Sequence, residues 1–189
     1  MSRLVAVFVV VQGLLWPGPA VGSLIIPATL AELADDALAI VHGRVTAVRP
    51  QWTAGRRGIE SLVTVAVSGY LKGDLGPTVT VRTPGGTLGA YRTVVVGAPV
   101  FREGDEVVLF LATHGPSIPF ILGLGQGAYR VVPQPGTGRR VVKPALFDAT
   151  AAAQRLVRGD PGRGSVPLQE FSDRLRQVVA DLPSGGRQR

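Results

Sequence analysis

The residues best suited to catalysis are two neighbouring carboxylates, Asp105 and Glu106. A carboxylate pair can supply a general acid and a general base for hydrolysis when its surroundings separate the two pKa values. These two acids follow Gly104 in a charged stretch and immediately precede an apolar run, so turn residues are the simpler interpretation. A secreted hydrolase that combines one of them with a distant carboxylate remains an alternative hypothesis.

Other chemistry-bearing residues form no recognisable constellation. The two histidines, His42 and His114, have no acid at metal-ligand spacing, and no serine–histidine pair stands in a nucleophile context. Asp35 and Asp36 could bind a cation, but no convergent ligands accompany them. The absence of cysteine and asparagine excludes disulfides, thiolate chemistry and N-glycosylation. We therefore expect no catalytic residue, no cofactor and no metal.

A glycine-rich stretch at residues 122–127 has the spacing GxGxG. Phosphate-binding loops have the spacing GxGxxG or end in a lysine, and they lead into a helix. Here the spacing differs, no lysine follows, and a strand is expected next. We therefore reject nucleotide binding. Alternating glycines in a strand more often allow another backbone or an aromatic ring to pack closely.

Arginine carries the net charge of +7, because only Lys72 and Lys143 are lysines. A basic chain can bind polyanions, and the candidate contacts are Arg49, Arg56, Arg57, Arg139 and Arg140. The arginines are scattered and are not interleaved with aromatic residues, so we expect a compositional bias and no nucleic-acid partner. Convergence of the five on one face would favour the polyanion hypothesis.

Residues 1–22 have the pattern of a secretory signal peptide. Arg3 provides a short basic start, an apolar core follows, and proline and glycine end it. Ala20 and Gly22 are the small residues that cleavage before Ser23 requires. An N-terminal core helix or an uncleaved anchor is the alternative. We expect a secreted or periplasmic protein with no stable membrane span after signal cleavage.

The body of the chain predicts short strands joined by turns. Hydrophobic residues make up 46% of the chain, and its 25 glycines and 15 prolines fall between apolar runs. Five consecutive apolar residues at 107–111 predict a strand covered on both faces. A change of parity at His42–Gly43 predicts a β-bulge or a barrel bend. The expected strands are residues 37–48, 60–71, 78–83, 91–96, 107–111, 129–132 and 139–143.

Two helices are expected to flank these strands. Thr29 and Glu32 form a capping box at the start of the first one. Ser165 is expected to cap the second, with Pro167 in its first turn. An apolar stripe on the second helix predicts that it packs on the domain. The stripe consists of Leu168, Phe171, Leu175, Val178 and Val179.

These elements predict a mainly β protein, because strand–helix–strand alternation is missing. We expect a small OB-like Greek-key barrel, flanked by a short N-terminal helix and a C-terminal amphipathic helix. The expected divisions are a signal peptide (1–22), a β-barrel domain (23–150), a linker (151–166), a C-terminal helix packed on the barrel (167–182) and a disordered tail (183–189).

Several segments resemble those of uncharacterised secreted bacterial proteins. These segments are AIVHGRV (39–45), GYLKGD (69–74), TPGG (83–86), FREGDEVVLFL (101–111) and GQGAYRV (125–131). The layout over residues 37–132 is also similar to the netrin-like module of tissue inhibitors of metalloproteinases. That resemblance implies an OB-like barrel. Those inhibitors use a disulfide-held N-terminal cysteine, which this chain does not have, so no residue inherits their inhibitory role.

The sequence therefore favours an exported, non-enzymatic binding module. Its barrel mouth or loops would contact a protein or a polymer of the envelope, with an extracellular or envelope protein as the expected partner. The hydrolase with paired carboxylates and the polyanion-binding protein are the alternatives.

Overall fold

The computed structural model describes residues 27–145 and 165–182, and within them the protein is mainly β, as predicted. The strands are β1 (Ala39–Trp52), β2 (Ile59–Lys72), β3 (Thr78–Pro84), β4 (Gly86–Leu88), β5 (Tyr91–Thr93), β6 (Glu106–Ala112), β7 (Phe120–Ile121), β8 (Ala128–Pro133), β9 (Arg140–Pro144) and β10 (Val166–Pro167). The helices are α2 (Leu30–Asp36), the 3-10 turn η1 (Ala54–Arg56) and α3 (Leu168–Ala180). The predicted signal peptide, most of the predicted linker and the predicted tail lie outside the described residues.

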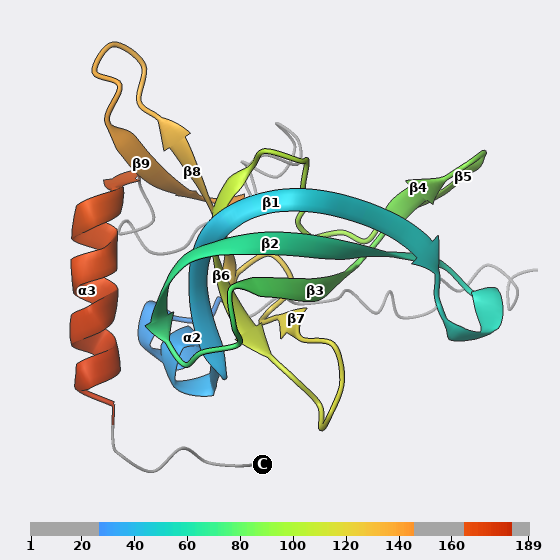
Figure 1. Ribbon diagram of the computed structural model, residues 1–189, viewed down its shortest axis with the longest axis horizontal. Helices are drawn as coiled ribbons and strands as arrows, with labels where there is room; N and C mark the ends of the chain where they lie inside the picture. Colours follow the sequence, from blue (N-terminus) through green and yellow to red (C-terminus); the bar gives the residue numbers. More distant parts are fainter. Residues whose placement is uncertain (1–26, 146–164, 183–189) are drawn as a thin grey trace, which may run out of the picture.

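Five strands close into a ring with the order β1–β2–β3–β7–β6–β1 (Figure 1). Strands β1, β2 and β3 follow one another as antiparallel neighbours, and β6 returns after a long connection to pair with β1. This is the Greek-key connection. Strands β3 and β7 run parallel and meet at one pair, Arg82 and Phe120. The predicted OB-like Greek-key barrel is therefore confirmed.

The first strand bends so that it can serve two partners. It pairs with β2 along most of its length, and its first half also pairs with β6. A register shift falls between His42 and Gly43, which confirms the predicted bulge. A Cβ at Gly43 would lie 2.4 Å from the carbonyl oxygen of Ala66, so only glycine allows this close approach of the two backbones.

Strand β6 is buried on both faces, as its five apolar residues predict. Val107, Leu109 and Leu111 belong to the core inside the barrel. Val108 and Phe110 belong to a second core between the barrel and the helices. Successive side chains of a strand point to opposite faces, so one strand supplies both cores.

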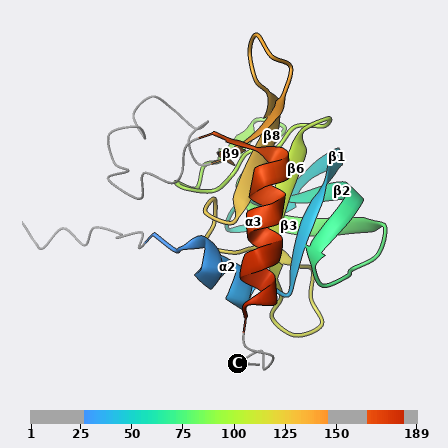
Figure 2. The same ribbon diagram turned by 90° about the vertical axis from the view of Figure 1, so that its left-hand side faces the viewer.

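The two helices cover the outside of the barrel on the side of the second core (Figure 2). The capping box of α2 is confirmed, because Thr29 Oγ1 accepts from the N–H of Glu32, and the Glu32 carboxylate accepts from the N–H of Thr29. In α3, the buried residues are Leu168, Phe171 and Leu175. The ring of Tyr129 lies between Phe110 and Phe171, at centroid distances of 5.8 and 5.0 Å.

Two local expectations were wrong. Ser165 does not cap α3, because residues 166–167 pair with β9 as β10 and the helix begins only at Leu168. The strand expected at residues 91–96 ends at Thr93, because β5 turns back onto β4 in a small hairpin. In the glycine-rich stretch, β7 is followed by turns, and a Cβ at Gly127 would lie 2.7 Å from the carbonyl oxygen of Leu122.

Candidate functional site

An open groove of about 330 Å³ lies where the loop between β1 and β2 meets the end of β3. Its position combines segments that are far apart in the sequence. The lining residues are Thr53, Arg57, Gly58, Ile59, Glu60, Arg82, Pro84, Thr93, Val95 and Phe120. This volume falls at the lower end of the range for small-ligand sites, and it also suits one or two side chains of a protein partner.

The groove combines apolar lining with arginines. Its apolar side chains are Ile59, Pro84, Val95 and Phe120, and its charged residues are Arg57, Glu60 and Arg82. The one acid is already engaged. Glu60 Oε2 lies 3.5 Å from Arg82 Nε, and Glu60 Oε1 accepts a hydrogen bond of 2.9 Å from the Gln51 side chain. The lining therefore has a positive balance, which suits a ligand that carries both an apolar and an acidic group.

The loop beside the groove is held by Thr53. Its hydroxyl accepts from the N–H of Gly58 at 3.2 Å and donates to the carbonyl oxygen of the same residue at 3.1 Å. The guanidinium of Arg56 lies over the Trp52 ring, 5.3 Å from its centroid, and Tyr91 meets that ring edge-on. The loop is thus fixed at both ends, and Arg57 stays exposed at the groove.

The five candidate polyanion contacts come from two separate segments of the chain. Arg49 lies on β1, and Arg56 and Arg57 lie in the loop that follows it. Arg140 begins β9 and Arg139 directly precedes it, in the β8–β9 hairpin at the upper left of Figure 1, whereas the loop with η1 is at the lower right. The five arginines are therefore divided between two separate parts of the fold.

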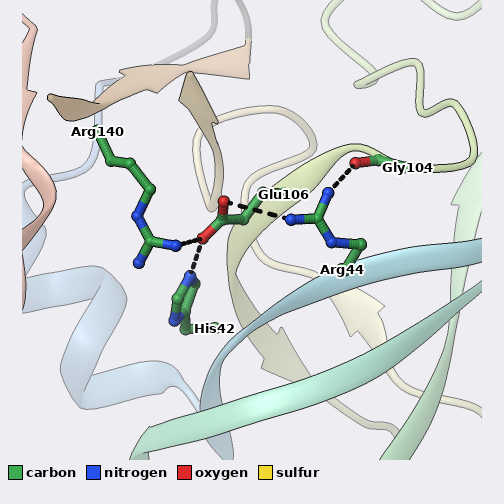
Figure 3. A network of polar contacts seen from close by, with 5 residues as sticks. All are labelled: His42, Arg44, Gly104, Glu106 and Arg140. Carbon is green, nitrogen blue, oxygen red and sulfur yellow. Dashed lines mark hydrogen bonds and ion pairs between the residues drawn. The ribbon is translucent and has the colours of Figure 1, made fainter. Parts of the chain in front are cut away.

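A second polar cluster surrounds Glu106, whose side chain is 13% exposed (Figure 3). Its Oε1 lies 2.8 Å from Nε2 of His42 and 2.9 Å from Nη1 of Arg140. Its Oε2 lies 3.8 Å from Nη2 of Arg44, whose Nη1 donates to the carbonyl oxygen of Gly104. One carboxylate thus connects β1, β6 and β9.

The two carboxylates expected to be turn residues have different roles. Asp105 is a turn acid, because it accepts a hydrogen bond of 2.8 Å from the N–H of Arg102, and it lies 3.6 Å from Arg130. Glu106 is the first residue of β6 and is largely buried, so that interpretation was wrong for it. The acids have separate cationic partners, and this geometry does not form an acid pair.

The remaining sequence candidates lie outside the Glu106 cluster, and none of them lines the groove. Asp35 and Asp36 are the exposed last residues of α2. The ring of His114 stacks on Phe120, 4.6 Å between centroids, at the edge of the groove. Within residues 27–145 and 165–182, no three histidine or acidic side chains gather as a metal site. Among the same residues, no helix is long and apolar enough to cross a membrane.

Sequence reasoning missed both the groove and the Glu106 cluster. Arg44 lies opposite Glu106 and His42 lies opposite Val108 only because β1 and β6 pair in one particular register. No local pattern shows that register. No protein-family model matches the chain, and no curated protein matches it in sequence.

Proposed function

We propose that this chain is an exported, non-enzymatic module that binds an extracellular or envelope protein through the groove. The observation that carries the proposal is the combination of four apolar side chains with Arg57 and Arg82 in one concave site. An OB-like barrel commonly presents its ligand site on the second and third strands and the adjoining loops, which is where this groove lies. The partner would insert an apolar side chain and place an acidic group beside the arginines.

Binding is favoured over hydrolysis because Asp105 and Glu106 are both engaged in contacts away from the groove. Hydrolysis by two carboxylates needs both of them to face one substrate bond. Asp105 closes a turn and Glu106 is engaged by His42 and Arg140, so neither faces the groove. Protein binding is favoured over polyanion binding because Arg139 and Arg140 lie in a different hairpin from the arginines at the groove.

Export is proposed from the basic start, apolar core and small residues that precede Ser23. A chain without cysteine can fold in an oxidising compartment without disulfide exchange. The long β1–β2 hairpin and the Greek-key ring also support the proposal that the layout is that of a netrin-like module.

The test is a pull-down with residues 23–189 from the secreted and envelope fractions of the host. Val95→Asp places an acid at the groove, which would repel an acidic partner group and disturb the apolar contact. Val94→Asp is the matched control, because Val94 is adjacent to Val95 in the chain but is 69% exposed and does not line the groove. We expect a protein that the wild type and Val94→Asp capture and Val95→Asp does not. Equal capture by all three proteins would refute the groove as the binding site.

A further inference from the structure

Strand β3 has an open edge beside the groove. On one side it pairs with β2 from Thr78 to Pro84. On the other side its neighbour is β7, and the two strands form one residue pair, Arg82 with Phe120. Within the described part of the chain, no strand pairs with the preceding residues of β3 on that side.

The hydrogen bonds identify which peptide groups face the open side. The N–H of Gly85 donates to the carbonyl oxygen of Ile59 in β2, and the carbonyl oxygen of Pro77 accepts from the N–H of Val67 in β2. The backbone N–H and C=O groups of the odd-numbered residues therefore point toward β2. The N–H of Arg82 donates to the carbonyl oxygen of Pro119, so the backbone N–H and C=O groups of the even-numbered residues point away from β2. Successive peptide groups of a strand point to opposite sides. The N–H and C=O groups of Thr78 and Thr80 therefore face the open edge.

The open stretch has the composition of a strand that another strand can join. Thr78 and Thr80 are β-branched and partly or fully exposed, and Thr80 has neither a charge nor a proline beside it. Proteins usually protect such an edge with lysine, proline or a bulge. Here the prolines, Pro77 and Pro84, stand only at the two ends, and they limit the open stretch to its middle.

We propose that the partner adds an extended acidic segment to this edge as a further β-strand. The proposal rests on the proposed function as a protein-binding module and specifies how the partner is held. Main-chain hydrogen bonds to Thr78 and Thr80 supply affinity, as in other cases of strand addition. Side chains that alternate along the added strand supply the selectivity.

The two faces of β3 define which side chains suit the added strand. Val79 and Val81 point inward and are 4% and 0% exposed, so inward residues of the partner must be small and apolar. On the outer face, Arg82 is 45% exposed on its side chain, and Arg57 lies across the groove. Outward residues of the partner are therefore acidic, and they compete with Glu60 for Arg82.

The experiment uses residues 23–189 and an acetylated, amidated octapeptide of alternating glutamate and valine that carries a fluorophore. Thr80→Pro removes an N–H that faces away from β2, so it leaves the β2 pairing intact. Thr80→Ala is the matched control, because it removes the side chain and keeps the N–H. We expect micromolar binding to the wild type and to Thr80→Ala, and binding at least about tenfold weaker to Thr80→Pro. The corresponding lysine–valine peptide is expected to bind at least about tenfold more weakly than the glutamate peptide.

Equal affinity of Thr80→Pro and Thr80→Ala would overturn the proposal, and so would failure of the wild type to bind the peptide or equal binding of the lysine peptide. Amide hydrogen exchange on the wild type tests the same contact if Thr80→Pro does not fold. The Thr80 amide should become protected when the peptide is added, and unchanged exchange would also overturn the proposal. The Val95→Asp pull-down tests the groove separately, so a failure of strand addition is distinguishable from a failure of the proposed function.

Discussion

Truncation of Leu109 and of Phe110 to alanine tests the two-core arrangement. Both side chains are fully buried, but Leu109 lies inside the barrel and Phe110 lies beneath the helices. Leu→Ala changes in well-packed cores cost about 2–5 kcal/mol and Phe→Ala changes about 3–5 kcal/mol, from lost burial and a residual cavity. We expect both variants to lose stability in these ranges, because neither face of β6 is in contact with water.

The second core adds a sharper expectation. Phe110 and Phe171 both pack against Tyr129, whereas Leu109 belongs to the other core. Combining Phe110→Ala with Phe171→Ala should therefore be non-additive by about 0.5 kcal/mol or more. Combining Leu109→Ala with Phe171→Ala should be additive within about 0.5 kcal/mol.

Chemical denaturation of residues 23–189 measures each free energy of unfolding from the midpoint and the slope. The cysteine-free chain allows these measurements without disulfide exchange. Two results would refute the reasoning. A nearly neutral Phe110→Ala would mean that this face of β6 is wet, and equal coupling of Phe171 to Leu109 and to Phe110 would mean that the two cores are not separate.

Three further predictions concern single positions. Glu106→Gln should cost about 1–2 kcal/mol of unfolding free energy, because it weakens two charge-assisted hydrogen bonds whose arginine is partly screened by water. Asp173, which forms an exposed ion pair with Arg176, is the control, since Asp173→Asn should cost about 0.5 kcal/mol or less. An equally small effect of Glu106→Gln would contradict a stabilising role of the Glu106 cluster. Hydrogen bonds from Thr29, first from its backbone N–H and then from its side chain, lower the pKa of Glu32 below the ordinary 4.5. The contribution of the Glu32 carboxylate to stability is therefore present above pH 4.5 and is lost as the pH falls through the folded-state pKa. Wild type should therefore lose more stability than Glu32→Gln when the pH falls from neutrality to below 4.5, and parallel curves would show that the capping box has no such role. N-terminal sequencing of protein recovered outside the host cytoplasm should begin near Ser23, and an intact Met1 on cytoplasmic protein would argue against export.

The parts of the fold that were predictable depend on local patterns. A run of five apolar residues identified β6, a parity change identified the bulge at Gly43, and Thr29 with Glu32 identified the start of α2. Each pattern spans a few residues, and tertiary packing supports it. The β-branched run at residues 94–96 shows the opposite case, because no strand in the described part of the chain pairs with it and Val96 is left 84% exposed. Strand propensity is realised only where a neighbour strand is present.

The candidate site depended on information that local patterns do not contain. The groove brings together segments around Thr53, Arg82, Val95 and Phe120, which become neighbours only when the ring closes. The charge cluster needs Glu106 to pair in register with Arg44. The arginine pairs were visible in the sequence, but their distribution over two separate hairpins was not.

The double pairing of β1 has a consequence for the order in which the protein can fold. The hairpin with β2 can form as soon as residues 39–72 have emerged, because its partners are close in the chain. The contact between His42 and Glu106 of β6 spans 64 residues, and the ring cannot close before β7 is available. Until then the apolar first half of β1 is an open strand edge, which is prone to pair with other chains. The slowest and most aggregation-sensitive step is therefore expected to be the arrival of β6, and a chaperone that shields residues 39–45 during that interval would raise the yield of folded protein.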